Sequence, residues 1–206
     1  LVVCVATMIV GNLFALPQRN VKRLLGYSGI AHIGLLLLVV GLANIDGVAV
    51  MLFYLMAYVF TNMGAFLVAD VVGRASGDDV DAYNGLGQRS PALALAMLLF
   101  LLSLGGIPFV AGFWAKLFLF IAVWKAGLGI LVVLGAVLAV VALFYYLKIG
   151  RAIYIAPAAD DAPAIEVGRP TAFAIGIAVG GVLLMGVIPG PFIELARAAA
   201  QGVLGG

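Results

Sequence analysis

The sequence has 206 residues, of which 66% are hydrophobic and only 10% are charged, and its net charge is +2. Soluble domains carry about 25% charged residues, so this composition excludes an ordinary soluble protein. No basic cluster is interleaved with aromatic residues, which excludes nucleic acid as a partner. The mean hydropathy of +1.26 instead indicates a polytopic membrane helix bundle of the all-α class, in contact with a lipid bilayer.

Six apolar segments are predicted to cross the membrane as helices. They cover Leu1–Leu16, Leu24–Ala43, Val48–Val72, Pro91–Trp124, Leu128–Ile149 and Thr171–Ile188. A helix of about 20 residues spans a hydrocarbon core of about 30 Å. The first segment starts at Leu1 inside an apolar run and has no signal-peptide pattern, so we expect the chain to begin within a longer protein.

Two polar stretches and a tail connect and follow these segments. Arg74–Arg89 is a predicted loop, and Ile155–Pro170 is a second predicted loop. The tail Phe192–Gln201 is predicted to form a short helix at the membrane surface.

The fourth segment is too long for a single span. Its 34 residues would extend about 51 Å as one helix, far more than a bilayer requires. Gly105 and Gly106 weaken a helix at this point. Pro108 has no N–H group and clashes with the carbonyl group of Leu104. We therefore predict two half-helices joined near Gly105–Pro108, with freed backbone groups that need protein partners or a water-filled cavity.

The distribution of lysine and arginine predicts the orientation. With six spans, the loops and span ends of one side hold eight of these residues: Arg19, Lys22, Arg23, Arg74, Arg89, Lys148, Arg151 and Arg169. The other side holds only Lys125 and Arg197. Because cytoplasmic loops are enriched in cations, we expect the first side to face the cytoplasm and the C-terminus to lie outside.

Lys116 is a cation inside the fourth segment, near the centre of the predicted half-helix Phe109–Trp124. Burying a cation at mid-membrane costs about 2.5–3.5 kcal/mol on insertion scales, so such residues are candidates for function. Nine acidic residues are possible partners, and none is predicted at mid-membrane: Asp46, Asp70, Asp78, Asp79, Asp81, Asp160, Asp161, Glu166 and Glu194. Desolvation without a counter-charge disfavours the ammonium form, which favours proton exchange. The alternative is a structural lysine that binds carbonyl groups at the helix break.

His32 is the only histidine and falls near the middle of the second segment. Imidazole titrates near neutrality, which suits a proton relay. A neutral histidine bonded to a neighbouring helix fits the same position equally well.

Tyr54, Tyr58 and Asn62 recur every four residues along the third segment. Residues with this spacing lie near one another on a helix surface. Such a stripe could form a secondary polar path for water or protons, although it is more typical of hydrogen bonds between helices.

The sequence offers no site for a metal or a cofactor. Cys4 alone cannot form an internal disulfide or a metal site, and we interpret it as a small apolar filler. The carboxylates within Gly77–Asp81 lack the spacing of a calcium loop. No motif for a flavin, a haem or an iron–sulfur cluster is present.

Three stretches resemble a known family. Gln18–Gly34 (QRNVKRLLGYSGIAHIG) is similar to the antiporter-like subunits of respiratory complex I and of cation/proton antiporter complexes. Tyr54–Phe66 (YLMAYVFTNMGAF) and Ser103–Lys116 (SLGGIPFVAGFWAK) resemble subunit N of bacterial NADH–quinone oxidoreductase more specifically. The resemblance covers essentially the whole chain, which would correspond to the C-terminal half of a subunit of that family.

The resemblance implies a fold with two inverted five-helix repeats, each with one broken helix. Residues 1–150 would be the second repeat, and residues 151–206 would hold a cytoplasmic loop, the final transmembrane helix and a short tail. Lys116 would match the lysine of the broken helix that is proposed to exchange protons, and His32 would lie in a helix next to the hydrated axis. The first repeat, with its own glutamate and lysines, is absent from these residues.

We therefore expect a proton-translocating membrane subunit of NADH:quinone oxidoreductase in the bacterial inner membrane, with other membrane subunits as partners. The resemblance places NADH, FMN, iron–sulfur clusters and quinone in partner subunits and no redox chemistry in this chain. Two alternatives stay open, namely a subunit of a multisubunit sodium/proton antiporter and a non-conducting membrane scaffold.

Overall fold

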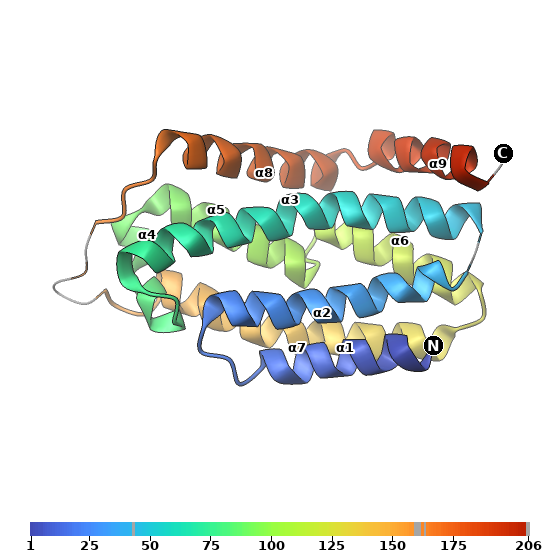
Figure 1. Ribbon diagram of the computed structural model, residues 1–206, viewed down its shortest axis with the longest axis horizontal. Coiled ribbons are helices and arrows are strands. Elements are labelled where there is room, and N and C mark those ends of the chain that lie inside the picture. Colours follow the sequence, from blue (N-terminus) through green and yellow to red (C-terminus); the bar gives the residue numbers. More distant parts are fainter. Residues whose placement is uncertain (43, 159–161, 163, 205–206) are drawn as a thin grey trace.

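The protein is a bundle of long helices that run along one axis (Figure 1). The computed structural model describes residues 1–42, 44–158, 162 and 164–204. The helices are α1 (Val2–Ala15), α2 (Val21–Val40), α3 (Ile45–Ser76), η1 (Val80–Tyr83), α4 (Leu86–Arg89), α5 (Pro91–Gly105), α6 (Ala111–Lys125), α7 (Gly129–Tyr154), α8 (Arg169–Val187) and α9 (Gly190–Leu204). The described residues form no β-strand beyond one isolated bridge, so the prediction of an all-α bundle is confirmed.

Each predicted segment corresponds to a helix or, in one case, to a pair of helices. By length and composition, α2, α3, α7 and α8 can each cross a membrane, while α1 and α5 are shorter apolar helices. The helix α7 continues five residues past its predicted end, to Tyr154. The helices α2 and α3 both begin three residues earlier than predicted. Their starts are set by Asn20 and Asn44, whose side chains accept hydrogen bonds from the backbone three residues later. Ala43, the predicted end of the second segment, lies outside the described residues.

The fourth segment is broken as predicted. The half-helix α5 ends at Gly105, and α6 begins at Ala111. Gly106 closes α5 in the left-handed region with a φ of 82°, which glycine adopts without strain. Phe109 also has a positive φ, of 73°, which costs a residue with a side chain about 1–3 kcal/mol. The break is therefore held in place by its surroundings.

The predicted loop Arg74–Arg89 is more ordered than expected. The helix α3 continues to Ser76, and η1 and α4 then follow, with the side chains of Tyr83 and Leu86 fully buried. The backbone N–H of Val80 donates to the carbonyl of Arg19 at 2.8 Å, which ties this segment to the turn before α2. Buried apolar side chains within a polar stretch explain why the segment folds onto the bundle end.

The tail forms a helix, as predicted, but it does not lie across the end of the bundle. Figure 1 shows α9 continuing the direction of α8 along the edge of the bundle, and α9 packs against α3. Ala196 and Ala200, four residues apart, are buried small residues of α9. Small residues at this spacing allow close packing of helices, which accounts for the alignment of α9 with α3. That α9 lies at a membrane surface stays a prediction.

The close packing of α1 against α2 depends on glycine. A Cβ atom placed on Gly34 would lie 2.6 Å from Cγ and 2.7 Å from the backbone N of Met8. A Cβ atom on Gly11 would meet the backbone of Ala31 in the same way. The absence of both side chains lets the two backbones approach, as in other membrane helix pairs.

Gly34→Ala is expected to destabilise the protein, because the added methyl group forces α1 away from α2. Overpacking of this kind costs about 1–3 kcal/mol. Gly26→Ala, on the same helix, is the matched control, since a Cβ there meets no atom within 4 Å and alanine favours the helix. Thermal unfolding of the full-length protein in detergent should show a lower midpoint for the first variant alone. Equal midpoints would show that the α1–α2 contact is not tight.

Candidate functional site

Lys116 lies in the second turn of α6 and is buried, with 7% of its surface exposed. It is closer to the start of its half-helix than predicted, because α6 begins at Ala111 and not at Phe109. Its Nζ atom donates a hydrogen bond to the carbonyl oxygen of Leu104 at 2.6 Å. In an unbroken helix that carbonyl would accept from residue 108, but Pro108 has no N–H to give. The lysine therefore supplies the donor that the proline removes.

The start of α6 is fixed against the end of α5 by Gly112 and Ser103. The backbone N–H of Gly112 donates to the hydroxyl oxygen of Ser103 at 3.1 Å. A Cβ atom on Gly112 would overlap the carbonyl group of Ser103, so only glycine fits. The Ser103 hydroxyl also pairs with the hydroxyl of Thr61 on α3 at 2.9 Å. These contacts set the depth at which Lys116 meets α5.

The sixth span holds the break from the other side. The indole N–H of Trp114 donates to the carbonyl oxygen of Gly186 on α8 at 2.8 Å. A Cβ atom on Gly186 would lie 2.5 Å from Cα of Val110 and 2.8 Å from the carbonyl carbon of Phe109. The strained residue Phe109 is thus packed against a glycine of α8, which explains how its positive φ is maintained.

His32 lies on α2 and is buried among tyrosine hydroxyl groups. Its Nδ1 atom pairs with the hydroxyl of Tyr54 at 2.7 Å. Its Nε2 atom lies 3.4 Å from the hydroxyl of Tyr146 on α7, a long hydrogen bond. The Tyr146 hydroxyl pairs in turn with that of Ser28. The ring of Tyr58 packs beside the imidazole, with a distance of 5.3 Å between ring centres.

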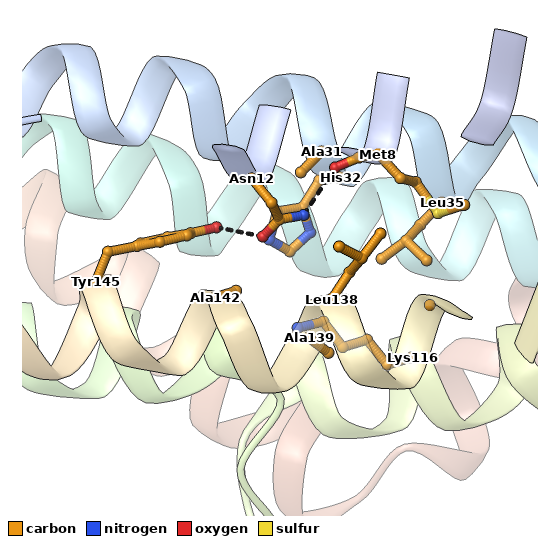
Figure 2. A pocket seen from close by; sticks show the side chains of 11 residues that line it. Met8, Asn12, Ala31, His32, Leu35, Lys116, Leu138, Ala139, Ala142 and Tyr145 are labelled. Carbon is orange, nitrogen blue, oxygen red and sulfur yellow. Dashed lines mark hydrogen bonds between the residues drawn. The ribbon is translucent and has the colours of Figure 1, made fainter. Parts of the chain in front are cut away.

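A second polar pair joins α1 to α7. The hydroxyl of Tyr145 donates to Oδ1 of Asn12 at 3.2 Å, as Figure 2 shows. The side-chain amide of Asn12 donates in turn to the carbonyl oxygen of Met8 at 2.9 Å. Six helices, α1, α2, α3, α5, α6 and α7, therefore contribute hydrogen-bonding side chains to one buried region of the bundle.

Two small cavities lie within this polar region, and both are lined by His32 and Lys116. The first, drawn in Figure 2, has a volume of about 20 Å³ and is also lined by Asn12, Leu35, Leu138 and Tyr145. The second has about 10 Å³ and is also lined by Tyr54, Tyr58, Thr61 and Ser103. A polar cavity of about 10–15 Å³ is enough for one water molecule. The first cavity therefore has room for one water molecule beside the histidine and the lysine, and the second lies at the limit.

The region holds one lysine and one histidine, and no described acidic residue lines its cavities. The structure describes seven of the nine acidic residues, and none of the seven lines either cavity. Asp160 and Asp161 lie outside the described residues. The described residues also contain no group of three His, Cys, Asp or Glu that could hold a metal ion. The polar partners of Lys116 and His32 are therefore neutral carbonyl and hydroxyl groups.

The structure brings together Lys116, His32, Tyr54 and Tyr58 but not Asn62. Asn62 is half-buried and lines neither cavity, and Thr61 takes the place expected for it. The reason is helical geometry. At about 100° per residue, position 61 lies about 20° from Tyr54 around the helix and position 62 lies about 80° away. Residues spaced by four therefore move steadily around the helix, whereas residues spaced by seven stay on nearly the same face.

Two further residues of this region, Tyr145 and Tyr146, were not predicted from the sequence. Both are buried, and their hydroxyl groups bond to Asn12, Ser28 and His32. The available signal was a pair of adjacent hydroxyl groups inside the apolar segment Leu128–Ile149. Buried tyrosine hydroxyls need partners, and those partners point to a polar region.

Comparison with known proteins identifies the family. Residues 1–142 match the family model described as the transmembrane region of the NADH:quinone oxidoreductase/Mrp antiporter subunits. A relative from Heliobacterium modesticaldum, named NADH-quinone oxidoreductase subunit N, is 44% identical over 200 residues. The match covers 96% of this chain and 42% of that relative, so the chain spans less than half of the relative's length.

Solved structures agree with the sequence match. A chain of respiratory complex I from Thermus thermophilus with bound aureothin is 34% identical, with a TM-score of 0.81 over 94% of this chain and 44% of that one. A chain of the Mrp complex from Dietzia sp. DQ12-45-1b is 25% identical, with a TM-score of 0.86 over 98% of this chain and 46% of that one. This chain belongs to the NADH:quinone oxidoreductase/Mrp antiporter family of membrane subunits.

Proposed function

We propose that this chain forms the C-terminal part of a proton-translocating subunit of NADH:quinone oxidoreductase, with Lys116 as the proton carrier. Residues 1–150 then form the second five-helix repeat of that subunit, and residues 151–206 add the last span and α9. The partners are other membrane subunits of the complex. NADH, FMN, iron–sulfur clusters and quinone belong to those partners, where the electron transfer takes place.

One observation carries the proposal, namely that Lys116 bonds to a carbonyl oxygen and not to a carboxylate. A carboxylate would stabilise the ammonium form strongly and oppose release of its proton. A carbonyl oxygen is neutral, and a neutral amine retains N–H groups that can still donate to it. The contact with Leu104 is therefore compatible with both protonation states of the lysine.

The cavities supply a path between Lys116 and His32. Because both residues line both cavities and no described acid does, two positive charges at these positions would repel each other in a medium of low dielectric. Protonation of one residue thus favours a neutral state of the other. A change of hydration or charge brought about by a neighbouring subunit would shift the proton between them. His32 then acts as a relay, held by Tyr54 and Tyr146.

Exchange of sodium for protons is the main alternative, and the site supports it less well. Sodium requires oxygen ligands, whereas the cavities present an amine and an imidazole, and no described carboxylate lines them. A passive scaffold is the second alternative, in which Lys116 only satisfies the Leu104 carbonyl. The two alternatives are separated from the proposal by the substitutions below.

The cation distribution orients the proposed subunit. Figure 1 shows both chain ends at one end of the bundle, and eight of the lysines and arginines belong to the turns and helix ends at the other end. By the positive-inside rule the second end faces the cytoplasm and the C-terminus lies outside the bacterial inner membrane.

Lys116→Arg is expected to reduce proton pumping by the assembled complex by at least tenfold while the subunit still assembles. Arginine keeps a donor for the Leu104 carbonyl but does not release its proton in proteins. Pumping into sealed vesicles would be followed with a pH-sensitive dye during NADH oxidation, without sodium. A purely structural lysine predicts that the arginine variant pumps normally, and a sodium antiporter predicts no pumping in this medium at all.

Lys148→Arg is the matched control. Lys148 also donates to a backbone carbonyl, that of Gln18 at 3.1 Å, but it lines neither cavity. Its substitution should leave pumping unchanged.

The single variant His32→Gln should slow pumping. Combined with Lys116→Arg it should add little to the loss, because the effects of residues that act as a unit are not additive.

Cysteine labelling tests the orientation. Gly202→Cys and Gly168→Cys place thiols where a Cβ meets no atom within 4 Å. In intact cells, an impermeant maleimide should label the first variant and not the second, while inverted vesicles should show the opposite. Labelling of Gly168→Cys in intact cells would mean that the protein has the opposite orientation in the membrane.

A further inference from the structure

The two cations at the cation-poor end of the bundle share one cavity. Lys125 ends α6 and Arg197 lies in α9, and both line a cavity of about 220 Å³ where α6, α9 and the start of α3 meet. Apart from Lys116, the other lysines and arginines belong to loops and helix ends at the opposite end. That Lys125 and Arg197 line the same cavity is therefore a specific feature of this end.

The rest of the cavity wall is mostly apolar. The helix α3 contributes Ala49 and Val50, α6 contributes Phe118 and Ile121, and α9 contributes Ile193. Ile121 is an exposed large hydrophobic residue on the outside of the bundle. The apolar part of the wall therefore reaches the bundle surface that faces lipid chains in a membrane.

The level of the cavity along the bundle is that of a membrane surface. Trp124 precedes Lys125 at the end of α6, and 63% of its surface is exposed. Exposed tryptophan residues gather at the boundary between the hydrocarbon core and the headgroups. The charged rim of the cavity then lies among the headgroups, and its apolar wall lies below them.

The rim carries more positive than negative charge. Lys125 forms no ion pair with any residue that the structure describes. Nη2 of Arg197 lies 3.7 Å from Oδ1 of Asp46, which is longer than a hydrogen bond. Asp46 also lies in the first turn of α3, where its charge interacts favourably with the helix dipole. Two cations and one carboxylate leave the rim attractive to an anion.

We propose that this cavity binds an anionic phospholipid. The phosphate lies between Lys125 and Arg197, and one acyl chain lies against Val50, Phe118 and Ile193. The volume is below the about 300–1,000 Å³ of pockets that enclose whole ligands, which fits a site that holds only part of a large amphiphile. The combination of a basic rim and an apolar wall between helices is one that recognises anionic headgroups.

The test uses the full-length protein in its assembled complex, reconstituted into phosphatidylcholine vesicles. A small fraction of phosphatidylglycerol with a photoreactive acyl chain is added, and the labelled peptides are mapped by mass spectrometry. The probe should label peptides of α6 and α9. Removing one cation, by Lys125→Gln or Arg197→Gln, should lower this labelling about fivefold, and removing both should lower it about thirtyfold.

Two further variants separate the effect of the positive charge from the effect of the cavity volume. Arg23→Gln combined with Arg169→Gln removes the same charge at the opposite end, outside this cavity, and should leave labelling of α6 and α9 unchanged. Ala122→Phe fills the cavity, keeps both cations, and should also reduce labelling.

Three results would overturn the proposal. Equal labelling by a phosphatidylcholine probe would mean that the site does not select the headgroup charge. Loss of labelling on addition of inorganic phosphate alone would mean an anion site without a lipid chain. Crosslinking of Lys125 to a neighbouring subunit, with no lipid label, would mean that a protein partner covers the cavity.

Discussion

The hydrogen bond between the Lys116 ammonium group and the Leu104 carbonyl is the contact on which the site depends. Pro108 deprives that carbonyl of its backbone donor, and the half-helix α5 ends with partial negative charge at this point. Lys116, which follows in the next half-helix, supplies the missing donor and gains a partner inside the membrane. The broken helix and the buried cation are thus two parts of one feature, and each offsets the cost of the other.

This contact differs from an ion pair in a way that matters for proton transfer. A carbonyl oxygen orients the lysine without fixing its charge, so water and neighbouring charges can still decide its protonation state. The cavities lined by His32 and Lys116 lie beside the lysine, where water could affect its protonation state. The supports around them, Gly112 against Ser103 and Trp114 against Gly186, hold the two half-helices at the required depth.

The sequence predicted the break and the lysine because both rest on strong local rules, a proline after two glycines and a charge in an apolar run. It did not predict the partners of Lys116, since a backbone carbonyl has no signature in a sequence. Asn62 does not line the cavities, because two steps of four residues turn about 80° away from Tyr54 around the helix. Tyr145 and Tyr146 were missed because their importance arises from contacts of α7 with α1 and α2, which lie more than 100 residues away in the chain.

Nitrogen-15 NMR of the lysine side chains in the assembled complex tests the central claim most directly, with the Lys116 signal assigned by its loss in Lys116→Arg. The account predicts that the Nζ of Lys116 changes between ammonium and amine when the resting complex is compared with the complex during turnover. A single ammonium signal, unchanged by turnover, would contradict it and leave Lys116 as a structural partner of the helix break.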